Sequence, residues 1–575
     1  MTMKKMLQYI LLSVCLQTLT GCQKTAEIED TDSVFEYREI YLPEQNTKDT
    51  KKLKLNLVDN EWGIWGHHLK KVLPKNPSLS VFATIGGRNN DEQFCFMSDK
   101  LFQYIEAYIH DNYGATRSQR FAILPNDNGL VCQCEQCRRI GCTTKNATPA
   151  VMHMLERLSH RFPAHTFFTS YYLTTRSVPA KPMPVNTGVL ISAMDYDLNT
   201  KVSAKELQFE NLLRRWGGVT KNIYVWDYIN NFDDYFTPFP VFNVMQRRFK
   251  LFAKTGVRGV FLNGSGSDYS TFSRLKTYVL AAMLRDPECD WKKVLEEKCM
   301  EFYPVTGKLI AQYIMKQEAF VVTNGKPLPL YEGVATALKH YLNEQDFVDF
   351  HNQLILLLPK TQGEERKEIT RLNAALMLTR LEIRRLHGDT RGCKAMLEQL
   401  QRIVQEDVRI YSESYWTVES YIKDFQVMLQ EAEEVKGKNL LQGLMLTPLT
   451  ALDPDYSDIS ILTDGLAGIP SNYHCGQMIS SADPSLKIAI PHVDGMKRLR
   501  VGLTYNAQFH IALPLSVSLM AGDNEIETIK PQQQGISGRY VAEFNIPASA
   551  NRTLVLVVTR NKEERTMAID EVTGL

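Results

Sequence analysis

A short stretch near the middle of the chain combines acidic and aromatic side chains in a pattern that suits chemistry on a sugar. Residues 222–240 begin with a β-branched and aromatic run that is typical of a buried strand. The expected strand ends at Trp226-Asp227-Tyr228, which places one carboxylate between two large rings. The rings could stack on sugar C–H groups while the carboxylate acts on a glycosidic bond. The alternative is that Asp227 is a buried residue that caps the following helix.

Polar and aromatic residues also follow several other expected strands. Barrels of alternating strands and helices carry their catalytic groups where the strands meet the loops at their carboxyl ends. Glycoside hydrolysis needs one acid to protonate the leaving oxygen and a second group to stabilise the transition state. We therefore expect Asp127 and Asp227 to be catalytic, although a single aspartate at a strand end is also typical of a turn. The sugar-binding residues expected from these loops are Asn126, Tyr172, Asp195, Trp226, Tyr228, Asn231, Tyr235, Asn263 and Asp268.

Other common catalytic motifs are not found in the sequence. There is no phosphate-binding glycine loop, no Ser/His/Asp elbow and no His-Glu-x-x-His helix. Trp65 and His67 lie in a tryptophan-rich segment that we expect at the mouth of a barrel, where His67 would donate to sugar hydroxyls or be a structural histidine. Arg88 follows an expected strand and could pair with a barrel carboxylate, or it is a surface arginine.

Four cysteines stand close together after the Asp127 loop. Cys132, Cys134, Cys137 and Cys142 have a spacing that could hold zinc tetrahedrally, and Cys95 is a fifth candidate. Disulfides that fix the Asp127 loop are the alternative in an exported protein. In both cases we expect a structural role, and no cofactor is required for catalysis.

The chain is long enough for several domains and predicts a multidomain α/β protein. At ~100–200 residues per domain, 575 residues correspond to three or four domains. Residues 34–303 alternate between apolar strands and amphipathic helices, which predicts a TIM-type (β/α)8 barrel. The strands that we expect are 36–42, 53–57, 80–85, 120–125, 166–172, 189–194, 222–227 and 258–263.

The remaining sequence predicts two further domains. Residues 304–435 have the helical spacing of Leu, Ile and Met against Lys and Glu, which favours an α-helical bundle. Residues 436–575 contain short strands with turns at regular spacing, which predicts a β-sandwich. The motifs Leu462-Thr463-Asp464-Gly465 and Ile569-Asp570-Glu571-Val572 make this part similar to galactose-binding-like (discoidin-type) domains.

The N-terminus has the features of a bacterial lipoprotein signal. Two lysines precede an apolar run that ends in Leu19-Thr20-Gly21-Cys22, so we expect cleavage before Cys22 and lipidation of that residue. Residues 1–22 would then be the signal peptide and residues 23–33 a flexible leader. The formal net charge of +1 gives no reason to expect a nucleic-acid partner. We therefore expect a protein of the cell envelope, anchored by lipid to the outer membrane on its periplasmic face or at the cell surface.

A series of motifs resembles one known family over roughly residues 35–315. The sequence is similar to the Bacteroidetes lipoproteins labelled domain of unknown function 4838, part of which is classed as glycoside hydrolase family 163, endo-β-N-acetylglucosaminidases acting on complex N-glycans. The resemblance implies a TIM-barrel glycosidase and a glycan ligand. It is carried by Tyr37-Arg38-Glu39, Leu55-Asn56, Trp62 to His67, Ala83 to Arg88, Gln93-Phe94-Cys95, Pro125-Asn126-Asp127, Cys132 to Cys137, and Trp226 to Pro240.

The sequence departs from this family at one consequential position. Where the family commonly shows Phe-x-Glu-Gly, this chain has Phe261-Leu262-Asn263-Gly264. If the family's glutamate is the proton donor, Asn263 cannot replace it, because an amide has no proton to give at neutral pH. Two functions follow. The first is a glycoside hydrolase acting on β-linked N-acetylglucosamine in complex glycans of the host N-glycan type. The second is a catalytically silent, glycan-binding lipoprotein.

Overall fold

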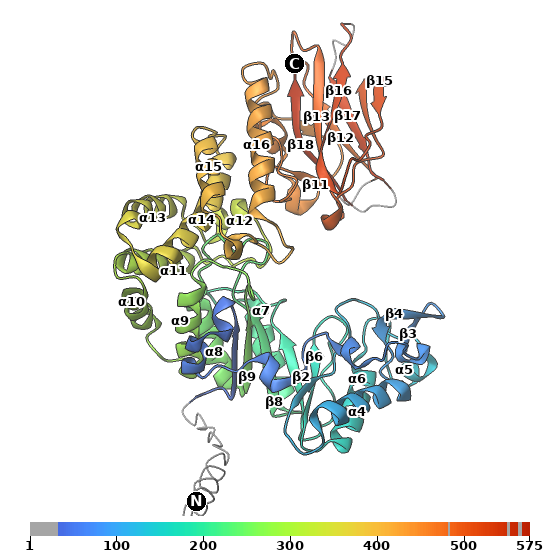
Figure 1. Ribbon diagram of the computed structural model, residues 1–575. Coiled ribbons are helices and arrows are strands. Elements are labelled where there is room, and N and C mark those ends of the chain that lie inside the picture. The colour runs from blue at the N-terminus through green and yellow to red at the C-terminus, as the bar shows by residue number, and fades with distance from the viewer. Residues whose placement is uncertain (1–32, 481–483, 549–552, 562–565) are drawn as a thin grey trace, which may run out of the picture.

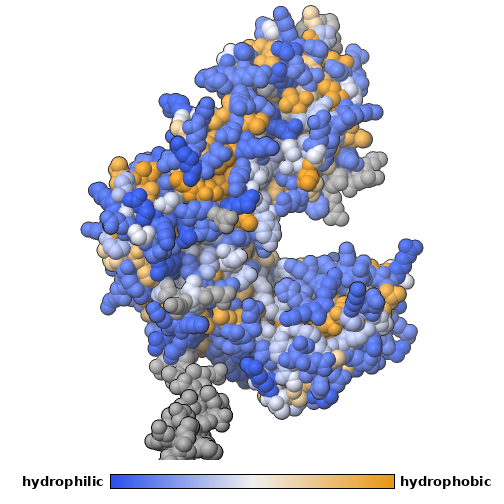
Figure 2. Space-filling model, in the orientation of Figure 1, coloured by the Kyte–Doolittle hydropathy of each residue, from blue (hydrophilic) through white to orange (hydrophobic). Residues whose placement is uncertain are grey.

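The structure is a computed structural model in which residues 33–480, 484–548, 553–561 and 566–575 are described. These residues form a parallel sheet with flanking helices, a group of further helices, and two antiparallel sheets (Figure 1). In Figure 1 the parallel sheet lies at the bottom and the antiparallel sheets at the top, with most of the other helices between them on one side. Figure 2 shows a deep hollow on the opposite side, between the antiparallel sheets and the lobe that contains α4 and α6.

The parallel sheet has seven strands, and their order across the sheet largely follows their order in the chain. This order is that of a barrel that does not close, because within the described ranges β1 pairs only with β9 and β2 only with β5. Across the sheet the strands are β1 (Tyr37–Tyr41), β9 (Gly259–Asn263), β8 (Asn222–Tyr228), β7 (Thr187–Ser192), β6 (Thr166–Tyr171), β5 (Arg120–Ala122) and β2 (Trp62–Ile64).

The predicted closed (β/α)8 barrel is therefore wrong, and residues 53–57 are one cause. This stretch alternates apolar and polar residues as a strand does, but it forms the end of α2 (Lys48–Leu53) and irregular chain before α3 (Val58–Glu61). It meets the free edge of β1 at Arg38, whose guanidinium donates to Lys54 O at 3.0 Å and whose backbone bonds to Asn56. There Arg38 N donates to the side-chain oxygen of Asn56 at 2.8 Å, and Asn56 N donates to Arg38 O at 2.8 Å.

The strand predicted at 80–85 also lies outside the parallel sheet. β3 (Phe82–Ile85) pairs antiparallel with β4 (Arg88–Phe94) in a separate ribbon. Gly86 and Gly87 connect them with φ angles of 54° and 79°. Two consecutive glycines with positive φ form the tight turn that matches the twist of a two-stranded hairpin, so the chain reverses direction here and cannot continue as a barrel unit.

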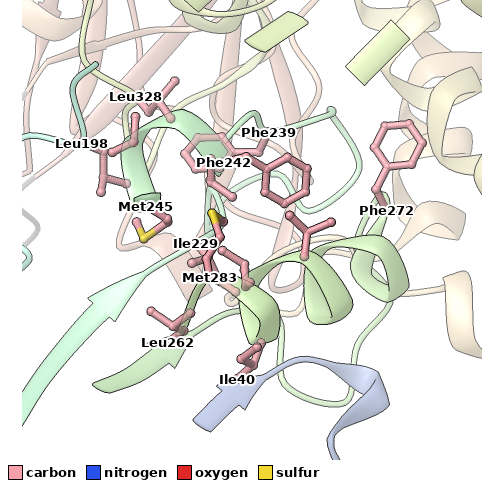
Figure 3. Close-up of a cluster of buried hydrophobic side chains, with 14 of the residues drawn as sticks. Ile40, Leu198, Ile229, Phe239, Phe242, Met245, Leu262, Phe272, Met283 and Leu328 are labelled. Carbon is pink, nitrogen blue, oxygen red and sulfur yellow. The ribbon is translucent and has the colours of Figure 1, made fainter. Parts of the chain in front are cut away.

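Side chains alternate between the two faces of the parallel sheet, and each face has its own packing. Ile40 of β1 and Leu262 of β9 belong to the large core formed with the helices, together with Met245 and Met283 (Figure 3). The opposite face carries a small cluster of Tyr37, Trp62, Phe168, Leu190 and Tyr224. The helices near the sheet are α4 (Asp99–Tyr113), α5 (Glu135–Arg139), α6 (Thr148–Arg161), α7 (Ala204–Gly217), α8 (Phe242–Thr255) and α9 (Ser273–Arg285).

A group of helices follows the sheet in the chain. None of the helices in the described ranges is long and apolar enough to cross a membrane. The helices of this group are α10 (Trp291–Phe302), α11 (Gly307–Asn324), α12 (Val334–His340), α13 (Glu344–Leu357), α14 (Gly363–Leu386), α15 (Cys393–Ile403) and α16 (Val418–Val435).

Two antiparallel sheets form the C-terminal part and pack on each other through one apolar core. Ile488 of β12 and Val501 of β13 belong to this core, as do residues of β14, β16, β17 and β18. One sheet contains, in order, β10 (Thr447–Pro448), β12 (Ser485–Ile490), β17 (Leu554–Thr559), β14 (Ser516–Ala521) and β15 (Asn524–Ile529). The other contains β11 (Met478–Ser480), β18 (Met567–Gly574), β13 (Arg498–Asn506) and β16 (Ser537–Asn545).

Candidate active site

A cleft lies at the carboxyl ends of the parallel strands. It consists of two adjoining hollows of about 520 and 480 Å³, both of which are lined by His67, Asp127, Trp226 and Asn263. The edge at which parallel strands end is where α/β enzymes bind their ligands. The structure thus brings together Trp226 and Asn263, which lie near the carboxyl ends of β8 and β9, and His67 and Asp127, which follow β2 and β5, as the sequence predicted for these four residues.

Aromatic rings form much of the first hollow. Trp65 and Trp226 stack with their ring centroids 5.0 Å apart and their planes 8° apart. Phe261 packs at an angle against both, at 4.8 Å from Trp65 and 4.5 Å from Trp226. These rings present apolar surface to the first hollow. Tyr172 and Tyr228, also predicted for the site, line the second hollow.

Asp127 is an exposed carboxylate that lines both hollows. Burial of Tyr172 raises the pKa of its hydroxyl, and the negative charges of Asp127 and Asp195 raise it further. The charge of Asp127 therefore acts on this neighbouring group. His67 Nδ1 lies 2.6 Å from the carbonyl oxygen of Pro125. A carbonyl can only accept, so this contact places a proton on Nδ1. His67 and Tyr172, whose ring centroids lie 6.0 Å apart, line the second hollow together with Asp127.

Asp227, the second predicted catalytic residue, does not reach the cleft. Its side chain is fully buried, and Arg248 NH1 of α8 donates to its two oxygens at 2.7 and 2.8 Å. Arg248 also donates to the carbonyl oxygens of Tyr196 and Asp197, which completes a closed polar network. The reason is the period of the strand: Trp226 points to the cleft, so its neighbour Asp227 points to the helices. The expected pair of Asp127 and Asp227 is not brought together.

Glu39 is a carboxylate of the cleft that the sequence analysis did not select. It lines the first hollow at 1% exposure, where the Tyr37 hydroxyl donates to one of its oxygens and Val58 N donates to the other at 3.1 Å. Burial raises the pKa of Glu39 from 4.5 to about 7. A carboxyl group of this kind still holds its proton near neutral pH, which is what a general acid requires.

A signal for Glu39 was present in the sequence. On a strand over residues 36–42, Tyr37, Glu39 and Tyr41 share one face, while Ile40 and Leu42 share the other. The apolar pair belongs to the core with the helices. The same alternation assigns Glu39 to the interior of the incomplete barrel and Asp227 to its exterior.

Glu413 enters the second hollow from outside the parallel sheet. It lies in the loop between α15 and α16, where Tyr331 Oη donates to its carboxylate at 3.0 Å and its own backbone N–H donates to Phe232 O at 2.7 Å. Burial raises the pKa of Glu413, and the charges of Asp233 and Asp127 add to the effect. No local motif marks this residue, because only the packing of the helices against the sheet brings it to the cleft.

The other predicted site residues lie outside the lining of these two hollows. Asn231 and Tyr235 are buried, and the Asn231 amide donates to Glu332 O at 2.7 Å. Asp195 forms an ion pair with Arg176 at 2.6 Å with both side chains about half exposed. Arg88 is exposed on β4, Asn126 donates to Glu92 O at 2.7 Å, and Asp268 accepts from Ser265 through its backbone oxygen at 2.6 Å. Cys22 lies outside the described residues.

The cysteine cluster forms with a different membership from the one predicted. The sulfur atoms of Cys95, Cys132, Cys134 and Cys137 all lie within 4.8 Å of one another and could hold a metal ion. Cys142 lies outside this group, and its thiol is 3.8 Å from Ala147 O. Within the described ranges every cysteine has a free thiol, so the predicted disulfides are not formed.

Comparisons with known proteins give one family and distant similarities to several solved structures. A family GH115 4-O-methyl-α-glucuronidase with specificity for decorated arabinogalactans shares 9% identity over 83% of this chain and 66% of its own length, with a TM-score of 0.33. A GH138 enzyme targeting pectin rhamnogalacturonan II shares 8% identity over 93% of this chain and 84% of its own, with a TM-score of 0.28. Neither similarity is close enough to establish a shared fold or activity. No curated protein matches the chain.

The match to a protein family is stronger evidence than these structural similarities, because the family model covers just over half of the sequence. It covers residues 22–315, which include the parallel sheet, both hollows of the cleft apart from Tyr331 and Glu413, and the cysteine cluster. The chain therefore belongs to the family described as domain of unknown function, DUF4838.

Proposed function

We propose that this protein is a glycoside hydrolase that cleaves β-linked N-acetylglucosamine in complex glycans of the host N-glycan type. The observation that carries the proposal is Glu39, a carboxyl group with a pKa of about 7 in an aromatic cleft that also contains the exposed carboxylate Asp127. Most glycosidases use two carboxyl groups that lie in different environments. The choice of sugar rests on the resemblance of the sequence motifs to glycoside hydrolase family 163.

In this proposal Glu39 donates its proton to the glycosidic oxygen as the bond between that oxygen and the anomeric carbon breaks. Positive charge then develops on the sugar ring, and Asp127 stabilises it directly or through the acetamido group of the substrate. Water finally adds to the anomeric carbon and returns a proton to Glu39. This reaction uses no cofactor. Trp65 and Trp226 supply the aromatic surface on which the sugar ring stacks.

The test is an assay of the full chain on N-glycoproteins and on aryl β-N-acetylglucosaminides. We expect turnover that Glu39→Gln and Asp127→Asn each lower by about 10²–10⁴-fold, the usual effect of removing an acid or a charge stabiliser. The matched control is Glu364→Gln, which removes an exposed carboxylate that pairs with Lys367 on α14 and should leave activity within about twofold. Unchanged activity in Glu39→Gln would reject the role of Glu39.

A second candidate function is a glycan-binding protein without catalysis, and Asn263 is the observation that favours it. Asn263 lines both hollows where the family commonly has glutamate. In this case the wild-type protein would bind N-acetylglucosamine-containing glycans without turnover, and Asn263→Glu would introduce activity. Binding and turnover measured on the same glycan panel separate the two functions.

We also propose that the mature protein is anchored to the outer membrane by lipid on Cys22, as the signal-like sequence before it suggests. The two C-terminal sheets would then be an accessory part for carbohydrate binding. Mass spectrometry of the mature N-terminus tests the anchor, since an unmodified Cys22 or an uncleaved signal would contradict it.

A further inference from the structure

We propose that Cys95, Cys132, Cys134 and Cys137 bind one structural zinc ion, and that this ion fixes the loop that carries Asp127. The site is independent of the proposed catalytic chemistry, since none of the four sulfur atoms is needed for glycoside cleavage. The zinc ion would instead fix the position of one wall of the cleft.

The spacing of the sulfur atoms matches a shared metal ion better than paired disulfides. Cys95 Sγ lies 3.7 Å from Cys134 Sγ and 3.8 Å from Cys137 Sγ, and all four sulfurs lie within 4.8 Å of one another. Four thiolates at about 2.3 Å from a central zinc would be separated by about 3.8 Å along the edges of a tetrahedron. A disulfide would draw two sulfurs to about 2.05 Å and leave the other two apart.

The backbone around the cluster is arranged to receive thiolates. Thr84 N donates to Cys132 Sγ at 3.3 Å, and Cys137 N donates to Cys134 Sγ at 3.5 Å. Such N–H groups stabilise negative charge on sulfur and orient the ligand. Cys134 is also the residue that caps the N-terminus of α5. The ligands thus come from two short, hydrogen-bonded segments that meet only in the folded chain.

The chemistry of the ligand set favours zinc in a structural role. Four thiolates are soft ligands that select zinc or iron, whereas magnesium and calcium prefer oxygen. Since the protein supplies all four ligands, no coordination position is left for water or substrate. Cys142 stays outside the group, which leaves it as a matched control for the ligands.

Hydrogen bonds connect this cluster to the Asp127 loop. Gln93 lies two residues before Cys95, and its amide nitrogen donates to Asn126 O at 3.2 Å and to the side-chain oxygen of Asn128 at 3.0 Å. Its amide oxygen accepts from Asn126 N at 3.0 Å. The side-chain amides of Asn126 and Asn128 both donate to Glu92 O, at 2.7 and 2.9 Å. Asp127 is therefore held between two residues that are bound to the segment leading to Cys95.

The experiment measures the metal content of the full chain by elemental mass spectrometry. We expect about one zinc per chain in the purified protein, at least a fivefold loss of zinc in Cys134→Ser and Cys137→Ser, and full content in Cys142→Ser. If a cysteine variant fails to fold, the wild-type stoichiometry decides alone. A zinc content below 0.1 per chain after purification without chelators and after zinc addition would overturn the proposal.

Two further measurements separate zinc from the alternatives. Alkylation of the denatured protein without reductant should label each of Cys95, Cys132, Cys134 and Cys137 once a chelator is added, whereas a disulfide among them would protect two and overturn the proposal. Iron in place of zinc would give visible absorption and would overturn the choice of metal. Hydrogen exchange of residues 125–137 should rise at least tenfold on chelation while exchange in α8 and α9 stays unchanged. Equal protection with and without metal would overturn the proposed link to Asp127.

Discussion

The two walls of the cleft are stabilised by different physical means. The first, which we call the helix-backed wall, consists of β8 and β9 with α8 and α9 behind them. The second, the loop wall, consists of residues 125–128 and His67, with the β3–β4 ribbon and the cysteine cluster behind them. The helix-backed wall is part of the largest apolar core. The loop wall packs on a second apolar core that includes Ala83, Phe94 and Val131, and its loop residues are held in addition by side-chain amides, one histidine and four sulfur atoms.

This difference determines which changes should destabilise each wall. Apolar burial contributes roughly 1.5–3 kcal/mol for each large side chain and needs no ligand from outside the protein. A hydrogen bond contributes roughly 0.5–1.5 kcal/mol, and a metal contributes only when it is bound. We therefore expect the helix-backed wall to resist changes in conditions, and the loop wall to respond to metal and to single amide substitutions. Arg248→Ala and Gln93→Ala test this contrast, and Glu39→Gln tests the buried carboxyl group of the cleft.

Arg248→Ala should have the largest effect, because it leaves the fully buried Asp227 carboxylate without its partner in the helix-backed wall. Removing one member of a buried ion pair typically costs ~3–5 kcal/mol of unfolding free energy. The measurement is denaturant unfolding followed by tryptophan fluorescence. As a control, Arg176→Ala breaks the half-exposed pair with Asp195 and should cost about 1 kcal/mol or less. Equal effects of the two substitutions would contradict the assignment of Asp227 to a structural role.

Glu39→Gln should change the pH dependence of stability. The folded state holds the proton of Glu39 up to a pH of about 7, whereas the unfolded state releases it near 4.5. Between these values the folded state binds more protons than the unfolded state, so this group lowers the unfolding free energy as the pH rises. The difference of about 2.5 pH units corresponds to about 3 kcal/mol.

The measurement compares wild type and Glu39→Gln at pH 4.5 and pH 7.5. The wild type should lose up to about 3 kcal/mol more than the variant over this interval, because glutamine does not titrate. In the same window, the proposed hydrolase activity of the wild type should decline above a pH of about 7, as the acid form of Glu39 is lost. Parallel stability profiles for the two proteins would show that burial does not raise this pKa.

Gln93→Ala should have the smallest effect on global stability and the most local one. The substitution removes the amide that bonds Asn126 and Asn128, and we expect a loss of ~1–3 kcal/mol, because buried backbone groups lose their partners. Hydrogen exchange should rise at residues 126–128 and not in α8. The control is Gln136→Ala, an exposed position on α5 that should change stability by less than ~0.5 kcal/mol. A uniform rise in exchange across both walls would contradict the division between them.

Several elements of the fold could be predicted because their signals are local. The strands predicted at 36–42, 166–172 and 258–263 all form. The last two are largely apolar runs of strand length, and 36–42 has an apolar face with Ile40 and Leu42 to bury. Strand alternation also contains the information that separates Glu39 from Asp227. The neighbours of Asp227 in the chain suggest a site residue, whereas the period of two places it on the face toward the helices.

Other features depend on contacts between distant parts of the chain. Asn231 and Tyr235 have the residue types of a sugar site, but packing against the helices buries them. Glu413 reaches the cleft from a loop about 150 residues beyond the last strand of the parallel sheet, so no motif near the barrel strands includes it. The departure from a closed barrel has the same origin, because whether an edge strand finds a partner depends on every segment that competes for it.

By itself, the sequence determined the elements with local causes: the strands that alternate and the short spacing of three cysteines. The tertiary structure alone decided which carboxyl groups share a cleft, that Cys95 completes the cluster, and that Glu39 retains a proton near neutral pH. The physical reason is that burial and charge depend on distance in space. Val58 and Tyr37, which contact Glu39, act on its carboxyl group only after the chain has folded.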